Sequence, residues 1–137
     1  MEQPLSLVLF SGTDDKLQSA AVMTAGAAAL GKPVHIFLQY WALDAFRSDR
    51  VTADHGLAAE AGEAGRAAVA TLNAKGQQHW SQILSDAKDV GQVDIQACSL
   101  SMDLLAITPA DLDGLVDGVE GVAAFWMAAG EGPVVFI

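Results

Sequence analysis

The chain is poor in cysteine and in basic residues, and each shortage excludes a class of function. Its one cysteine, Cys98, has no partner for an internal disulfide, which fits a reducing compartment. Seven Lys and Arg residues stand against seventeen Asp and Glu residues, a net charge of −10. Because phosphate contacts dominate the affinity of proteins for nucleic acids, neither a nucleic acid nor an anionic membrane is expected as a partner.

Long hydrophobic runs are also missing. None reaches the roughly 20 residues that a helix needs to span a bilayer, and the start MEQPLSLVLF has an acidic residue where a secretion signal has basic ones. We therefore expect a cytoplasmic protein without a membrane contact. Its 137 residues, 52% of them apolar, predict a single domain over 1–137 with a substantial core.

Strand-like and helix-like segments alternate along the chain. Strands are predicted over 5–10, 34–39, 93–97 and 133–137. Helices are predicted from Asp14 to about Leu30, over 80–90, near Ser99, from Pro109 and over 122–129. For the middle, 49–78, both a helix over 57–72 and a partly mobile segment are tenable. The alternation predicts an α/β fold: an open, mostly parallel sheet with helices on both faces, flavodoxin-like in layout.

In such sheets, ligands gather outside the carboxyl ends of the strands. Three predicted loops lie at that edge: 11–15, 40–43 and 98–102. Cys98 follows the predicted strand 93–97 and precedes the helix near Ser99. The pattern therefore places the lone thiol at the edge where chemistry is expected.

Three segments carry a family resemblance: FSGTDDK, HIFLQYWAL and IQACSLSMDLLAI, in that order. Together they resemble the DsrE/DsrF-like proteins, specifically the DsrE2-like branch that is sometimes labelled peroxiredoxin-like. The similarity covers roughly 5–46 and 80–137. Leu100 stands where the family usually has a methionine after the cysteine, and the long basic, methionine-rich insert of some members is missing.

The resemblance implies a sulfur-relay role in a DsrE-like fold. Members take up sulfane sulfur on a cysteine as a persulfide and pass it to a carrier, often a TusA-like protein. They assemble into trimers or hexamers. Carried onto this chain, the sulfur-bearing position is Cys98, and the resemblance implies no cofactor.

The residues around Cys98 suit that chemistry. A thiolate is the nucleophile toward a persulfide, and a helix start favours the anion. The expected site wall draws on the three loops at this edge: Gly12, Asp14, Tyr40, Trp41, Ser99, Ser101 and Met102. The three histidines have no spacing that suggests a metal site, so no metal is predicted.

Other interpretations stay open at this stage. Cys98 can be a buried filler in a non-catalytic, oligomeric interaction or ligand-binding module. Tyr40 and Trp41 can be core or oligomer contacts, and Asp14 can cap a helix. A one-cysteine peroxidase is a third reading, while the lack of a second cysteine weighs against a two-cysteine cycle.

Overall fold

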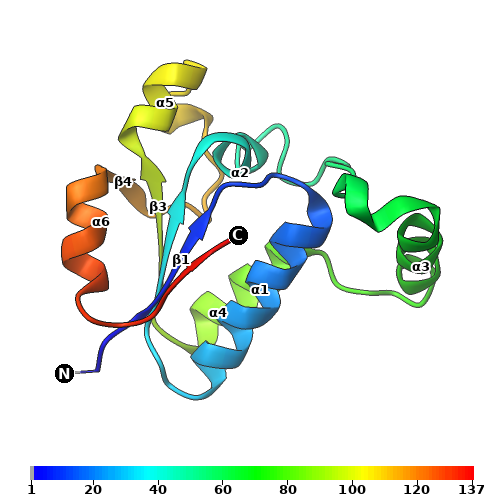
Figure 1. Ribbon diagram of the computed structural model, residues 1–137, viewed down its shortest axis with the longest axis horizontal. Helices are drawn as coiled ribbons and strands as arrows, with labels where there is room; N and C mark the ends of the chain where they lie inside the picture. Colours follow the sequence, from blue (N-terminus) through cyan, green and yellow to red (C-terminus); the bar gives the residue numbers. More distant parts are fainter. Residues whose placement is uncertain (1) are drawn as a thin grey trace.

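The computed structural model describes residues 2–137, which form a five-stranded sheet with helices on both faces (Figure 1). All strand pairs are parallel, in the order β4-β3-β2-β1-β5. The strands are β1 (Leu5–Leu9), β2 (Val34–Leu38), β3 (Val93–Cys98), β4 (Gly118–Glu120) and β5 (Val134–Phe136). The α-helices are α1 (Asp14–Ala29), α2 (Tyr40–Ala45), α3 (Gly62–Ala74), α4 (Trp80–Val90), α5 (Ser99–Leu105) and α6 (Val122–Ala129). The predicted flavodoxin-like α/β fold is confirmed.

One face of the sheet holds the main core. Alternate strand residues point to opposite faces, and the odd-numbered residues of β1 and β3 and the even-numbered residues of β2 lie on this one. They pack against α1 and α4, which lie side by side in Figure 1. The small side chains Ala20 and Ala21 of α1 are fully buried, as expected for a helix lying close to a sheet. This face buries Leu7, Leu9, Leu17, Ile36, Leu38, Trp80, Leu84 and Ile95.

The opposite face is thinly covered, and Cys98 lies on it. Here α6 stands alone, on the far side of the sheet from α1 and α4 (Figure 1). A small cluster of buried residues comprises Val8, Phe37, Cys98, Phe125 and Ala129. Both of its members from outside the sheet belong to α6. The reactive group predicted from the sequence is thus placed under a single short helix.

Two predicted features differ in detail. The spacing of Val90 from Trp80, Leu84 and Ala87 predicts that it shares their buried face of the helix, but Val90 is the last residue of α4 and is 69% exposed. Pro109 opens only a single 3₁₀ turn, Pro109–Asp111, not a longer helix. That turn closes on itself through a capping box between Thr108 and Asp111, and the chain then extends at Leu112.

Three elements were not predicted or were left open. No sequence signal marks β4, a three-residue edge strand, or α2, whose first residues lie in the predicted loop 40–43. In the open middle segment α3 forms a helix without a buried residue, preceded by the 3₁₀ turn Ala59–Ala61. Within 2–137, none of the helices combines the length and apolar character needed to cross a membrane.

Candidate functional site

Cys98 is the last residue of β3 and the N-cap of α5. Its thiol is free, and the residue is only 1% exposed. It belongs to the cluster of Val8, Phe37, Phe125 and Ala129 described above. The side chain makes no capping hydrogen bond to α5. The predicted position at the sheet edge is therefore correct, and the thiol lies below the surface rather than on it.

The loops after β2 and β3 meet through Tyr40 and Ser101. The Tyr40 backbone N–H donates to the Ser101 hydroxyl oxygen over 3.1 Å, and Ser101 is fully buried. Tyr40 has a φ of 45°, a left-handed conformation that is unfavourable for a bulky side chain. Such strain persists only where surrounding contacts hold it, and it gathers at functional sites. The contact shows that Ser101 positions the backbone at the start of α2.

The loop after β1 approaches the same place through Gly12 and Trp41. A Cβ atom on Gly12 would lie 2.3 Å from the Trp41 carbonyl oxygen, so only glycine fits here. The Trp41 side chain is 55% exposed. Both residues line a cavity of about 340 Å³, and Cys98 is not among the lining residues of that cavity. Gly12 and Trp41 thus lie together at the sheet edge where the predicted loops meet. They do not line a cavity with the Cys98 thiol.

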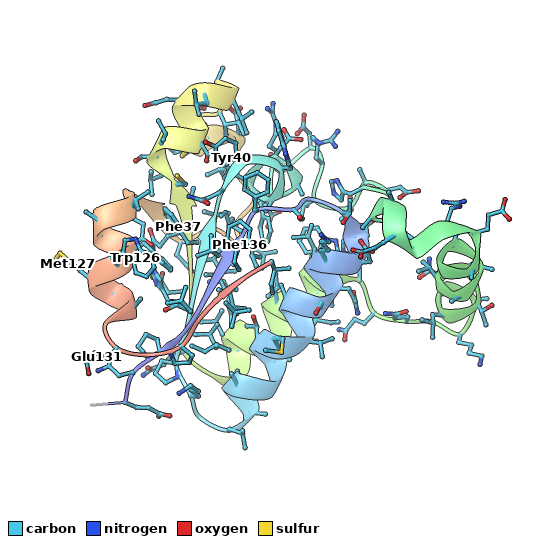
Figure 2. The ribbon with its side chains drawn as sticks, viewed as in Figure 1. Phe37, Tyr40, Trp126, Met127, Glu131 and Phe136 are labelled. Carbon is cyan, nitrogen blue, oxygen red and sulfur yellow. The ribbon has the colours of Figure 1, made fainter. Side chains whose placement is uncertain are left out.

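Aromatic side chains form a row along this edge. The Phe10 ring lies 5.1 Å from that of Tyr40 and 5.8 Å from that of Phe136, while Tyr40 and Trp41 are 6.1 Å apart. Figure 2 shows Tyr40 and Phe136 at the end of the sheet, with Phe37 between the sheet and α6. Phe136 is 66% exposed. The row gives the edge an apolar surface that is exposed at Trp41 and Phe136.

The remaining predicted residues divide into two groups. Met102 is buried in the main core, while Ser99 is half-buried at the start of α5. Asp14 serves a different structure: its carboxylate accepts from the Trp80 indole N–H over 2.9 Å and from the His55 backbone N–H over 2.9 Å. The N-cap of α1 is Thr13, whose side chain makes no capping bond. Asp14 thus ties the loop after α2 to α4 instead of capping.

Asp15 holds the same loop and supports a prediction about acid. Burial raises the pKa of this carboxyl, but the nearby Thr13 hydroxyl and the hydrogen bonds from the backbone N–H groups of Ala58 and Lys16 outweigh burial, so the pKa is lowered. A lowered folded-state pKa stabilises the fold above the unfolded value of about 3.9, and this contribution is lost as pH falls through the folded pKa. We expect Asp15→Asn to be less stable than the parent at pH 7, by less than about 1 kcal/mol because the carboxylate is only partly buried and water screens its charge.

Urea unfolding of both proteins between pH 7 and pH 3 checks this prediction. The difference in unfolding free energy should shrink toward the acid end, where the parent carboxyl is protonated. Asp89→Asn, on an exposed residue of α4, is the matched control and should track the parent throughout. A difference between Asp15→Asn and the parent that does not vary with pH would contradict the assignment.

Sequence reasoning missed the residues that cover and flank Cys98. His35 is buried, with Nε2 2.6 Å from Glu120 Oε1 and Nδ1 3.1 Å from Asp94 Oδ2. Its ring stacks on Phe125 at 5.7 Å. The alternation in β2 and β3 places His35 and Asp94 on the face of Cys98, but no local signal marks Phe125, because α6 is apolar on every side. Across residues 2–137, no three His, Cys, Asp or Glu residues are grouped so as to hold a metal ion.

Comparison with known proteins finds a family model and a curated relative that are similar to this chain. The model of the DsrE/DsrF/DrsH-like family matches residues 1–60. The uncharacterized protein YrkE of Bacillus subtilis (strain 168) is 29% identical over 150 residues, which cover 94% of this chain and 92% of YrkE. The predicted family resemblance is confirmed over residues 1–60, which hold the first two of the three sequence segments.

Two solved structures share the fold. The YchN protein of E. coli superposes with a TM-score of 0.58 at 12% identity, over 98% of this chain and 99% of YchN. MTH1491 of Methanobacterium thermoautotrophicum, a protein of unknown function, gives a TM-score of 0.51 at 14% identity, over 97% of this chain and 99% of its own. At these identities the comparison shows the fold alone.

Proposed function

We propose that this chain carries sulfane sulfur as a persulfide on Cys98 and passes it to a partner protein, because the model of the DsrE/DsrF/DrsH-like family matches residues 1–60. The family suggests a role in sulfur relay in general, and the sulfur-bearing residue is our proposal. The observation that carries it is the place of the only thiol, at the carboxyl end of β3 beside the loops after β1 and β2. That edge is where parallel α/β sheets hold their chemistry.

The transfer step is a thiol–persulfide exchange that needs no external oxidant or reductant. The Cys98 thiolate attacks the terminal sulfur of a donor persulfide or polysulfide, R–S–S⁻. The new Sγ–S bond forms as the donor S–S bond breaks, and the donor leaves as the thiolate R–S⁻. Cys98 then holds the atom as Sγ–S⁻. An acceptor thiolate takes the terminal sulfur in the same way, which returns Cys98 to its thiolate and consumes neither oxidant nor reductant.

A lone cysteine suits a carrier better than a self-contained cycle. Without a second cysteine in the chain, a persulfide on Cys98 has no internal thiol with which to collapse into a disulfide. The apolar neighbours Phe37 and Phe125 keep water from the sulfur. The thiol must be reduced to react, so we place the chain in the cytoplasm, where thiols are kept reduced.

Intact-mass measurement tests the proposal. The reduced protein is incubated with polysulfide, desalted and weighed, and a second portion is treated with a reductant before weighing. We expect the mass of one sulfur atom to be gained and to be lost on reduction. If the protein gains no sulfur although a disulfide reagent reaches Cys98, the proposal is wrong.

We propose a TusA-like sulfur carrier as acceptor, and a homo-oligomer, a trimer or a hexamer, as the working form. The support for assembly is the apolar surface left open: Met127 is 83% exposed, Phe136 66% and Trp126 57%. Figure 2 shows Met127 on the outer side of α6, pointing away from the sheet. Large apolar side chains exposed together are typical of interaction surfaces.

Light scattering checks the assembly. We expect the parent to have the mass of a trimer or a hexamer and Met127→Glu to shift toward the monomer, because a buried unpaired charge opposes association. Leu30→Glu, on an 88% exposed residue at the end of α1, is the matched control and should keep the parent mass. A parent that is monomeric at all concentrations contradicts this proposal.

A second candidate is a non-catalytic oligomeric module in which Cys98 only packs. The observation in its favour is the 1% exposure of Cys98. This candidate requires the thiol to react with iodoacetamide only when the whole protein unfolds. Reaction in the folded state, without urea, would exclude it.

A further inference from the structure

We infer that α6 is a lid over Cys98, and that the thiol becomes reachable when α6 leaves the sheet while the rest of the fold stays intact. The inference rests on the proposed role of Cys98 and names how access to that site is controlled. A sulfur carrier must expose its thiol to the donor and to the acceptor, but Cys98 is only 1% exposed.

In the hydrophobic cluster around Cys98, the residues from outside the sheet come from one element. Of the four residues clustered with it, Val8 and Phe37 belong to neighbouring strands and cannot move without breaking the sheet. Phe125 and Ala129 both belong to α6. In Figure 1, α6 has no neighbouring helix on its face of the sheet. Removal of α6 is therefore the smallest change that uncovers the thiol from this face.

The structure of α6 suits local detachment. It has 8 residues, and only Phe125 and Ala129 are buried. By contrast, α1 has 16 residues, five of them buried, and packs on α4. Isolated helices this short are not stable in water, so α6 depends on its contact with the sheet. Segments with few buried contacts open at lower free energy than the whole protein.

Glycines bound α6 at both ends. Gly121 is its N-cap, and Gly130 follows its last residue with a φ of 55°. A Cβ at position 130 would lie 2.2 Å from Gln3 Oε1, and this same oxygen accepts from the Glu131 N–H over 3.1 Å. Glycines at both boundaries let the chain change direction there with little steric penalty.

Phe125 is the contact that closes the lid. Its ring stacks on Phe37 at 4.9 Å with an interplanar angle of 18°, and on His35 at 5.7 Å. His35 is held in turn by Glu120 and Asp94. The ring thus docks on a surface that is already ordered by the strands. Loss of this one ring should favour the open lid more than it disturbs the sheet.

Native-state labelling of Cys98 tests the lid. The full chain is treated with a disulfide reagent at urea concentrations below the unfolding transition. Because the chain has one thiol, each labelling reaction reports on Cys98 alone. For the parent we expect labelling whose rate depends on urea much less steeply than global unfolding does, because detaching α6 exposes little surface. Phe125→Ala should raise the rate without urea by about 100-fold.

Leu84→Ala is the matched control. Leu84 is as buried as Phe125 but lies on α4, in the main core on the other face. It should lower global stability by a similar amount and leave the labelling rate without urea near that of the parent. If Phe125→Ala does not fold, Phe125→Leu replaces it, with a smaller expected rise of about 10-fold. A parent rate that follows global unfolding, or equal increases in both variants, overturns the lid.

The same experiment separates the lid from the proposed function. Labelling of the native protein without sulfur uptake from polysulfide leaves the lid standing and refutes the carrier. Sulfur uptake with labelling that follows global unfolding supports the carrier and refutes the lid.

Discussion

Cys98→Ser is expected to abolish sulfur uptake completely. The serine hydroxyl has nearly the same shape as the thiol, but it is not ionised at neutral pH and cannot attack the terminal sulfur of a persulfide. Because Cys98 is the only cysteine, no other thiol can replace it. The variant should show no added sulfur in the intact mass after polysulfide treatment, under conditions where the parent gains one atom.

Two controls separate chemistry from folding. The unfolding free energy of Cys98→Ser should fall by about 1–2 kcal/mol, since a hydroxyl replaces an apolar thiol in the cluster with Phe37 and Phe125, and the protein should remain folded. Ser85→Ala, on α4 and away from the site, leaves Cys98 in place and should keep the uptake. If Cys98→Ser gains as much sulfur as the parent, the sulfur is bound elsewhere and the proposed role of Cys98 is wrong.

The largest effect on stability is expected from Gly12→Ala. The new methyl group would lie 2.3 Å from the Trp41 carbonyl oxygen and 2.8 Å from its carbonyl carbon. Backbone atoms cannot rotate away as a side chain end can, and the Ala42 N–H also bonds to the Phe10 oxygen over 3.0 Å. The loops after β1 and β2 must therefore separate. We expect a loss of about 3 kcal/mol in unfolding free energy.

Gly26→Ala provides the comparison. Gly26 lies within α1, and nothing is within 4 Å of the position of its Cβ. The same substitution should stabilise the protein there by about 0.5–1 kcal/mol, because alanine favours a helix over glycine. Urea unfolding of both variants gives the two values. Equal effects of the two substitutions would contradict the close approach of Gly12 to Trp41.

Most of the sheet could be predicted from the sequence because its strands are buried. Leu5–Leu9 and Val34–Leu38 are short, apolar runs bounded by turn residues, and α6 has the bounds predicted for it. The three-residue strand β4 was not predictable, since Gly118–Glu120 contains one apolar residue and owes its conformation to pairing with β3. Likewise α2 begins at Tyr40 in a left-handed conformation that Ser101, sixty-one residues away, helps to hold.

The candidate site was predictable in part for a related reason. Cys98 ends a strand, and the segments at 11–15 and 40–43 each follow one. Strand ends in a parallel sheet meet at one edge, so the proximity of the three follows from chain order. Asp14 follows a strand too, yet its carboxylate binds Trp80 and the backbone of His55. The direction in which such a side chain points depends on how its helix packs against the sheet. The local sequence does not specify that packing.

The sequence alone determines that this protein is an acidic α/β domain with one thiol at the end of a strand. It determines this because burial periodicity, turn residues and cysteine number are local properties of the chain. Only the tertiary structure decides that the thiol lies on the thinly covered face of the sheet, beneath Phe125. The physical reason is that α6, apolar on every side, has no amphipathic pattern to select its buried face. Its contact with Phe37 and His35 exists only once the sheet has formed.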